Sequence, residues 1–176
     1  MKIAVWLLGI GSLLLAGAAQ ATEGQYTKVA GWEITTEPGV KRCFMQRFYL
    51  SKSGTTEGLI VAFDANEKQA LLFWSTTSKL FPLTEGKLDL DLRFRDGASI
   101  DQSWDNQSFH YKTVGKAHIF TLAFLEQESA NRILTDLASH AEIGLFLGPV
   151  LQTAFPLSAA AVQKLAECAA RPLSTG

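Results

Sequence analysis

The sequence predicts a mainly β (α+β) fold, an antiparallel β-sandwich or flattened barrel of about nine strands with two short helices, the second at the C-terminus. Three observations lead to this prediction. Short apolar or alternating runs are separated by turn residues along most of the chain. A capped helical segment closes the chain and carries one of its two cysteines. The other cysteine lies in the second predicted strand, so a bond between them would join the last helix to the start of the sheet.

The first residues predict export. Met1-Lys2 is a short basic start, residues 3–18 are apolar, and Ala19-Gln20-Ala21 has the small-x-small form of a signal-peptidase site. We interpret residues 1–21 as a signal peptide and expect a periplasmic or secreted protein. The apolar run approaches spanning length, so retention as a membrane anchor is the alternative. We expect no other contact with a membrane.

The rest of the chain predicts a single domain. Residues 22–30 form an irregular N-terminal lead, residues 31–171 a disulfide-closed β-rich domain, and residues 172–176 a C-terminal tail. The 16 Lys and Arg side chains nearly balance the 17 Asp and Glu side chains, for a net charge of −1, and no block of like charge is present. This balance argues against nucleic acid, whose binding depends on clustered basic side chains.

Cys43 and Cys168 predict a disulfide, because a cysteine pair in an exported protein is usually oxidised. Ser158 is a suitable helix N-cap, and Val162, Leu165 and Cys168 recur every three residues, which places the thiol on the buried stripe. Two unpaired buried thiols are the alternative. A redox role is disfavoured because the chain has no Cys-x-x-Cys pair.

The predicted strands are runs with apolar residues on one or both faces. Outside the hairpin treated next, they span residues 31–36, 41–50, 57–64, 69–75, 107–113, 116–125, 142–147 and 150–155, and a helix spans residues 128–139.

The clearest alternation covers residues 87–95, where apolar side chains face one way and charged side chains the other. We predict that a three-residue loop at residues 95–97 joins this strand to the return strand, because the register that such a loop sets pairs Leu92 with Ile100. A two-residue Asp-Gly turn would instead set Leu92 opposite Asp101 and bury a carboxylate.

The same register would gather carboxylates on the exposed face, with Asp91 opposite Asp101, Asp89 opposite Ser103, and Asp105 beyond. Facing like charges are unfavourable, so either neighbouring basic side chains neutralise them or a cation such as Ca²⁺ binds. A paired-carboxylate glycosidase is a further alternative for these residues. We expect no metal and no cofactor, and we keep Asp89, Asp91 and Asp101 as surface candidates.

Three histidines complete the candidate chemistry. His110 and His118 lie on adjacent predicted strands and could face one another, which would allow a metal pair or a hydrolytic base. His140 falls in the last turn of the predicted helix, where the dipole favours partial positive charge. Because no Gly-x-Ser-x-Gly motif and no third metal ligand accompany them, we expect surface or cap histidines and no catalytic residue.

Several short motifs carry a family resemblance. Trp32 begins the first strand, Cys43-Phe-Met-Gln46 lies in the second, a helix precedes an apolar strand pair, and Phe155-Pro-Leu-Ser158 leads into an Ala-rich helix. In these features the chain resembles small exported proteins of the invasion-associated locus B type. The resemblance implies a periplasmic or surface β-rich protein of a Gram-negative bacterium, linked in some pathogens to host-cell colonisation and without established enzymatic chemistry. Family members often carry a further cysteine where this chain has Thr35 and Thr36.

We therefore expect a non-enzymatic exported binding module, with a protein or glycan partner in the envelope or host. Its surface would include the rim loops at residues 51–56 and 76–85, and its many aromatic residues are of the kind that binding faces use. The alternatives are a small periplasmic hydrolase and a protein inhibitor of an envelope-degrading enzyme such as lysozyme. No motif defines an oligomeric state.

Overall fold

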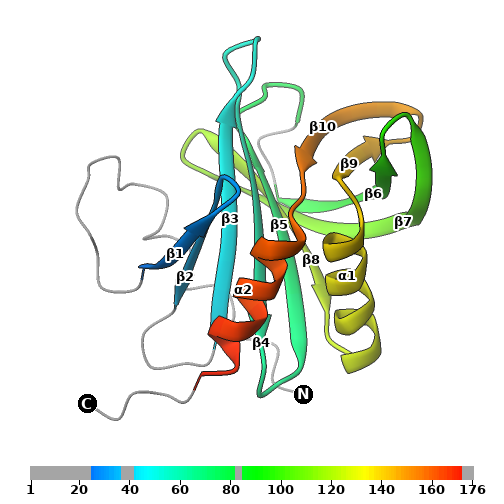
Figure 1. Ribbon diagram of the computed structural model, residues 1–176. Helices are drawn as coiled ribbons and strands as arrows, with labels where there is room; N and C mark the ends of the chain where they lie inside the picture. The colour runs from blue at the N-terminus through cyan, green and yellow to red at the C-terminus, as the bar shows by residue number, and fades with distance from the viewer. Residues whose placement is uncertain (1–24, 37–41, 82–84, 172–176) are drawn as a thin grey trace.

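The computed structural model describes residues 25–36, 42–81 and 85–171 (Figure 1). The predicted signal peptide at residues 1–21 and the tail at residues 172–176 lie outside these ranges. The described elements follow the order β1 (Gln25–Val29), β2 (Trp32–Thr36), β3 (Arg42–Leu50), β4 (Thr56–Asp64), β5 (Gln69–Thr76), β6 (Gly86–Asp96), β7 (Ser99–Val114), β8 (Ala117–Phe124), α1 (Gln127–Ser139), β9 (Glu142–Leu147), β10 (Val150–Pro156) and α2 (Ala159–Ala169).

All of these strands belong to one antiparallel sheet of ten strands, in the order β1-β2-β3-β4-β5-β8-β7-β6-β9-β10. The predicted class, mainly β with a C-terminal helix, is confirmed. The sheet bends strongly, so that β10 approaches β3 although the two strands are not neighbours in the sheet order (Figure 1). The hydroxyl oxygens of Tyr49 on β3 and Thr153 on β10 are 2.5 Å apart. The sheet is nevertheless not closed into a barrel, and β1 and β10 are its edges.

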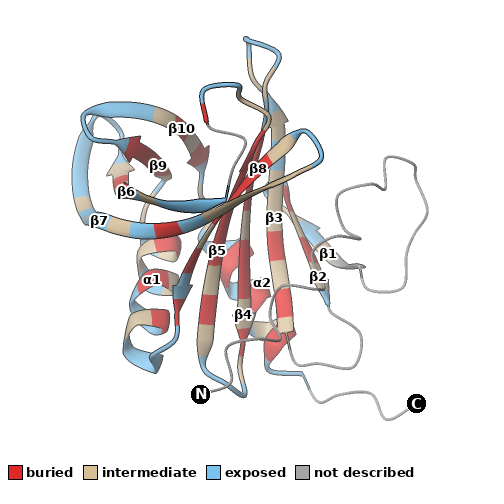
Figure 2. Cartoon of the chain, turned by 180° about the vertical axis from the view of Figure 1, so that it is seen from behind, coloured by how far each residue is buried: buried red, intermediate tan, exposed pale blue. Residues whose placement is uncertain are grey.

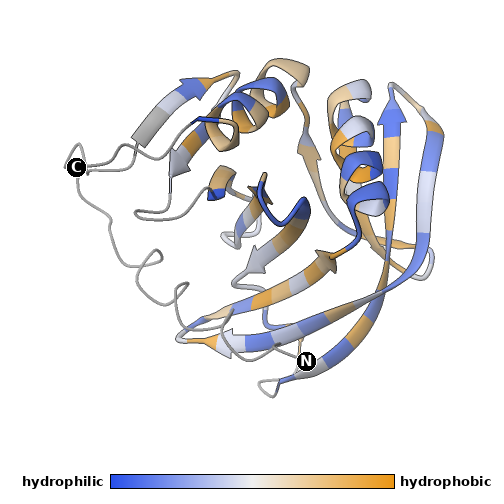
Figure 3. Cartoon of the chain, turned by 90° about the horizontal axis from the view of Figure 1, so that it is seen from below, coloured by the Kyte–Doolittle hydropathy of each residue, from blue (hydrophilic) through white to orange (hydrophobic). Residues whose placement is uncertain are grey.

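Both helices lie on the concave face and cover about its lower half (Figures 1 and 3). α2 packs on β2 and β3, and α1 packs on α2 and β5. Each helix is amphipathic and buries one stripe, which includes Ile133 and Leu137 on α1 and Leu165 on α2. Seen from behind, the hairpin of β6 and β7 curves away from the other strands, and much of its outer surface is exposed (Figure 2). The core is therefore enclosed between the bent sheet and the two helices.

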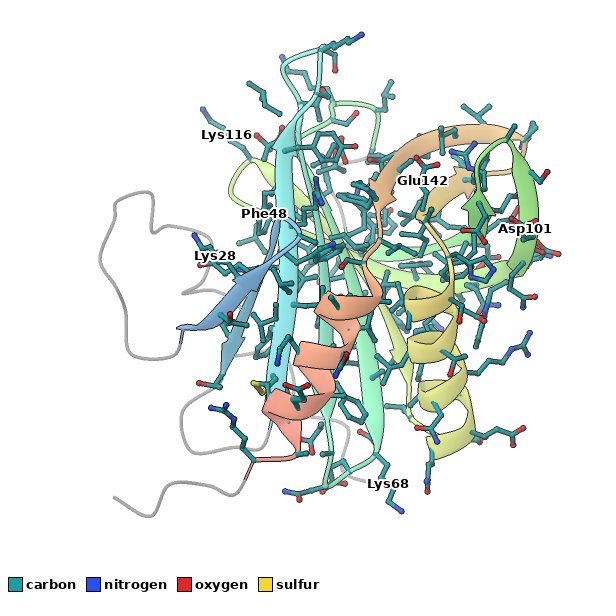
Figure 4. The ribbon with its side chains drawn as sticks, in the orientation of Figure 1. Lys28, Phe48, Lys68, Asp101, Lys116 and Glu142 are labelled. Atoms are coloured by element: carbon teal, nitrogen blue, oxygen red, sulfur yellow. A yellow bond between two sulfur atoms is a disulfide. The ribbon has the colours of Figure 1, made fainter. Side chains whose placement is uncertain are left out.

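The predicted disulfide between Cys43 and Cys168 is confirmed. It joins β3 to α2 across 125 residues of sequence, with the two Cα atoms 6.0 Å apart (Figure 4). The predicted cap is also present, since Ser158 Oγ accepts a hydrogen bond from the Ala161 N–H at 3.3 Å. The cap fixes where α2 begins, and the disulfide anchors its last turn to the sheet.

Two local expectations need correction. Residues 25–29, part of the predicted irregular lead, form β1 and pair with β2. The predicted β6–β7 register is wrong, because Asp96 pairs with Ser99 across a two-residue turn and Leu92 pairs with Trp104. Register shifts within β6–β7 allow this turn without burying a carboxylate opposite Leu92. The Trp104 indole N–H donates to Asp136 on α1 at 2.7 Å, so contact with the helix helps to set the register.

Candidate functional site

The helices leave one half of the concave face uncovered, and several turns lie together at the end of this half. The pairs Leu50–Thr56, Val114–Ala117 and Leu147–Val150 place the β3–β4, β7–β8 and β9–β10 turns at this end of the sheet. The β5–β6 connection begins here as well, after Thr76. We name this region the open end, and its turn residues are 51–55, 77–81, 85, 115–116 and 148–149. Both rim loops predicted from the sequence belong to it as far as they are described.

The open end holds a hollow of about 380 Å³. Its apolar lining consists of Leu80, Phe81, Leu88, Tyr111, Leu147 and Val150, and its polar lining of Lys87 and Gln152. Hollows that take small ligands begin at about 300 Å³ and are mostly apolar with few polar groups. This hollow therefore has the size and composition to accept one apolar group of a partner.

The floor of the hollow is an aromatic cluster continuous with the core. Phe81 packs edge-on against Trp74 and Phe120, with ring centroids 5.3 and 4.9 Å apart. Tyr111 packs against Phe120 at 5.4 Å, and Trp74 stacks on Phe120 at 4.5 Å. Because Trp74 and Phe120 are almost completely buried, the floor is held rigidly by the fold.

A row of polar side chains crosses the concave face beside this cluster. Tyr49, Glu57, Thr76, His118 and Thr113 are successive cross-strand partners on five adjacent strands. Thr113 Oγ1 and His118 Nδ1 are 3.1 Å apart, and the rings of Phe81 and His118 are in edge contact at 6.1 Å. This row was not identified from the sequence as a unit, because its members become neighbours only through the strand register.

Glu57 is the buried carboxylate of the row. Burial raises its pKa above the ordinary value, and hydrogen bonds from Trp74 and Thr76 partly oppose this shift. Trp74 Nε1 donates to one carboxylate oxygen at 2.7 Å and Thr76 Oγ1 to the other at 2.8 Å. Since both oxygens already accept hydrogen bonds and Glu57 does not line the hollow, it is placed as a structural group rather than as a general base.

His110 and His118 do not face one another, so the metal pair or hydrolytic base considered as an alternative is not formed. His110 pairs with Thr121 and His118 with Thr113, so the two histidines lie on opposite faces of the sheet. His110 is exposed, whereas His118 is buried, so the expected surface or cap position is wrong for His118. His140 caps the end of α1, with its Nδ1 2.9 Å from the carbonyl oxygen of Asp136. The histidines do not form a common site.

The predicted facing of Asp91 and Asp101 is also wrong. Asp91 lies opposite Phe146 of β9, and it accepts hydrogen bonds from the Asn106 N–H and from Arg93, both at 2.9 Å. These two interactions, the Asn106 hydrogen bond first, lower the pKa of Asp91. Asp101 instead accepts from the Asp96 N–H at 2.8 Å.

Asp89, the remaining acidic candidate, does not lie with Asp91 and Asp101 in a common site either. Asp89 is exposed opposite Ser108, and not opposite Ser103 as the predicted register required. In the part of the chain that the structure describes, no group of three or more His, Cys, Asp or Glu side chains is placed to hold a metal ion. Asp91 and Asp101 thus accept hydrogen bonds within the hairpin, and the described carboxylates of β6 and β7 do not converge on a common site.

No family model, curated protein or solved structure matches this chain. Within residues 25–36, 42–81 and 85–171, neither helix is long and apolar enough to cross a membrane. The class of this protein is therefore defined by its own fold and surface. It is a disulfide-linked, bent antiparallel sheet whose concave face is filled by helices at one end and carries an apolar hollow at the other.

One local feature of the sequence points to the hollow. Leu80 and Phe81 stand inside a connection otherwise rich in Ser, Thr and Lys, where polar residues are the rule. Phe81 turned out to be almost buried, whereas Leu80 is 83% exposed. An apolar pair in a connecting segment was therefore the available evidence for a binding edge.

Proposed function

We propose that this protein is an exported, non-enzymatic binding module that engages its partner through the open end. The observation that supports this proposal is where the exposed apolar side chains lie. Leu50, Leu80 and Val150 are 71%, 83% and 58% exposed, and all three adjoin or line the open end. Leu147 and Leu151 extend the same region along β9 and β10. Exposed apolar side chains that gather at one end of a folded protein are typical of an interaction site.

The distribution of reactive groups supports binding over catalysis. Glu57 and His118 contact the aromatic cluster through Trp74 and Phe81, and both are buried. Their hydrogen bonds go to neighbours in the sheet, and neither lines the hollow. A hydrolase would require a nucleophile and a base that meet at a substrate.

Export to the periplasm or beyond is part of the proposal, as is kinship with proteins of the invasion-associated locus B type. The Cys43–Cys168 bond supports export, because disulfides persist in oxidising compartments. The partner would be a component of the envelope or of a host surface.

Binding of an anionic apolar fluorophore such as anilinonaphthalene sulfonate tests the open end directly. Leu80→Ser and Val150→Ser should each weaken the probe about tenfold, because each removes apolar contact worth about 1.4 kcal/mol. Leu125→Ser and Ile100→Ser are matched controls, since these side chains are 57% and 51% exposed outside the open end. Equal losses in the control variants would exclude the open end as the binding surface.

An inhibitor of an envelope-degrading enzyme is the second candidate. The β3–β4 hairpin projects beyond the neighbouring strands (Figure 1), and its turn is held by a hydrogen bond from the Ser51 N–H to the Thr55 carbonyl at 2.8 Å. A lysozyme activity assay distinguishes this candidate. An inhibitor should lose potency when residues 52–54 are replaced by a shorter turn, whereas a binding module that acts through the hollow should show no inhibition before or after the change.

A further inference from the structure

The open end is basic as well as apolar. Lys52, Lys79, Lys87 and Lys116 lie in or beside its turns, and all four side chains are exposed. Figure 4 labels Lys116 at this end of the sheet and Lys68 at the opposite end. Among the described turn residues of the open end, Glu85 is the one exposed carboxylate. The region therefore carries a local excess of positive charge although the whole chain has a net charge of −1.

These lysines form no ion pair or hydrogen bond with another described residue. The ion pairs of the described chain involve Lys28, Arg42, Arg93, Arg95 and Lys164 instead. No carboxylate among the described residues neutralises these four charges, so they are available to an anionic partner.

The acidic side chains are concentrated elsewhere. The hairpin of β6 and β7 carries Asp89, Asp91, Asp96, Asp101 and Asp105. Asp101 is labelled on β7 in Figure 4, well away from Lys116. The same hairpin also carries Lys87, Arg93, Arg95 and Lys112, so its charges nearly cancel, and the exposed lysines of the open end are the part that an anionic surface would attract.

Exposed leucines lie next to the lysines in sequence and in space. Leu50 precedes the turn that contains Lys52, Leu80 follows Lys79 directly, and Lys87 lines the same hollow as Leu80. Interfaces between proteins are depleted in lysine and enriched in arginine and aromatic residues at their core. Lysines around exposed aliphatic side chains are instead typical of segments that lie in a lipid interface, where apolar groups enter the acyl region and lysines reach the headgroups.

We propose that the open end docks on an anionic lipid surface. Leu50, Leu80 and Val150 enter the boundary between headgroups and acyl chains, and the four lysines contact the anionic headgroups. The inference rests on the proposed function and names the partner class of the same surface. It adds to the predicted signal peptide a second way in which this chain contacts a membrane.

Vesicle flotation tests the inference with two lipid compositions, phosphatidylcholine alone and an equal mixture of phosphatidylcholine and phosphatidylglycerol. The full chain should bind the anionic vesicles more tightly than the neutral ones, and raising the salt from about 0.05 M to about 0.5 M should weaken this binding. The double variant Lys79→Gln/Lys116→Gln should bind anionic vesicles about 25-fold more weakly, at about fivefold for each lysine. Any contribution of the apolar residues 3–18 is common to all variants, so the differences between variants report the open end.

The matched control is Lys28→Gln/Lys68→Gln, which removes the same charge away from the open end and should change binding by less than about twofold. A urea unfolding curve for each variant ensures that only folded proteins are compared. Equal binding to both vesicle types, or an equal loss in the control double variant, would overturn the inference. If binding of the apolar fluorophore depends on Leu80 but the protein does not bind anionic vesicles, lipid docking is wrong and the proposed binding function still holds.

Discussion

Reduction of the Cys43–Cys168 disulfide should cause a large loss of stability. The bond spans 125 residues of sequence, and the chain-entropy relation for a loop of this length gives about 4.9 kcal/mol at 25 °C. A domain of this size has a free energy of unfolding of about 5–15 kcal/mol, so the bond accounts for a third or more of the total. Both cysteines are almost completely buried, hence reduction also frees the last turn of α2 from β3.

Urea unfolding followed by tryptophan fluorescence measures this effect in the oxidised and reduced proteins. With a slope of about 2 kcal/mol per M, the midpoint should fall by about 2.5 M on reduction. Cys43→Ala/Cys168→Ala serves as the control, because its midpoint should be low and insensitive to reductant. Coincident unfolding curves for the oxidised and reduced wild-type protein would refute the claim that this bond constrains the chain.

Three further substitutions test the polar contacts of the sheet. Glu57→Gln should become progressively more stable relative to wild type as the pH rises above the ordinary glutamate pKa. Because the pKa of Glu57 is raised in the folded state, the side chain contributes stability below that pH and loses this contribution as it ionises. A difference in urea midpoint between the two proteins that does not change with pH would contradict this. Tyr49→Phe should cost about 1 kcal/mol and accelerate amide exchange in β10, because the hydroxyl contact with Thr153 is lost; unchanged exchange in β10 would show that this contact does not hold the edge. Asp91→Asn should cost about 1 kcal/mol through weaker hydrogen bonds in the hairpin and leave fluorophore binding unchanged; lost binding by a folded variant would favour the carboxylates as the site.

The parts of the fold that sequence reasoning predicted depend on local chemistry. Ser158 caps α2, and Cys168 lies on its buried stripe, because cap and stripe are both set by residues a few positions apart. The disulfide followed from the expected compartment and from the presence of two cysteines alone. Strand positions were also largely predictable, since apolar runs bounded by turn residues require only the local pattern.

The errors arose where tertiary contacts or strand parity decided the outcome. In β6–β7, register shifts set Leu92 opposite Trp104, whose indole hydrogen bonds to α1, and no local pattern contains that information. His110 and His118 could have been separated from the sequence alone. Across a two-residue turn, directly opposed residues have numbers of opposite parity, and these two are both even. The hollow depends on the strand order, which places β9 beside β6 and so brings Leu147 and Val150 to the same hollow as Lys87 and Leu88.

Amide hydrogen exchange of the folded protein, with and without anionic vesicles, tests the central claim most directly. The account predicts protection in the β3–β4 turn, the described part of the β5–β6 connection and the β9–β10 turn, with little change in α1 and α2. Protection confined to the helices or to the β6–β7 hairpin, with the open end unchanged, would contradict the account.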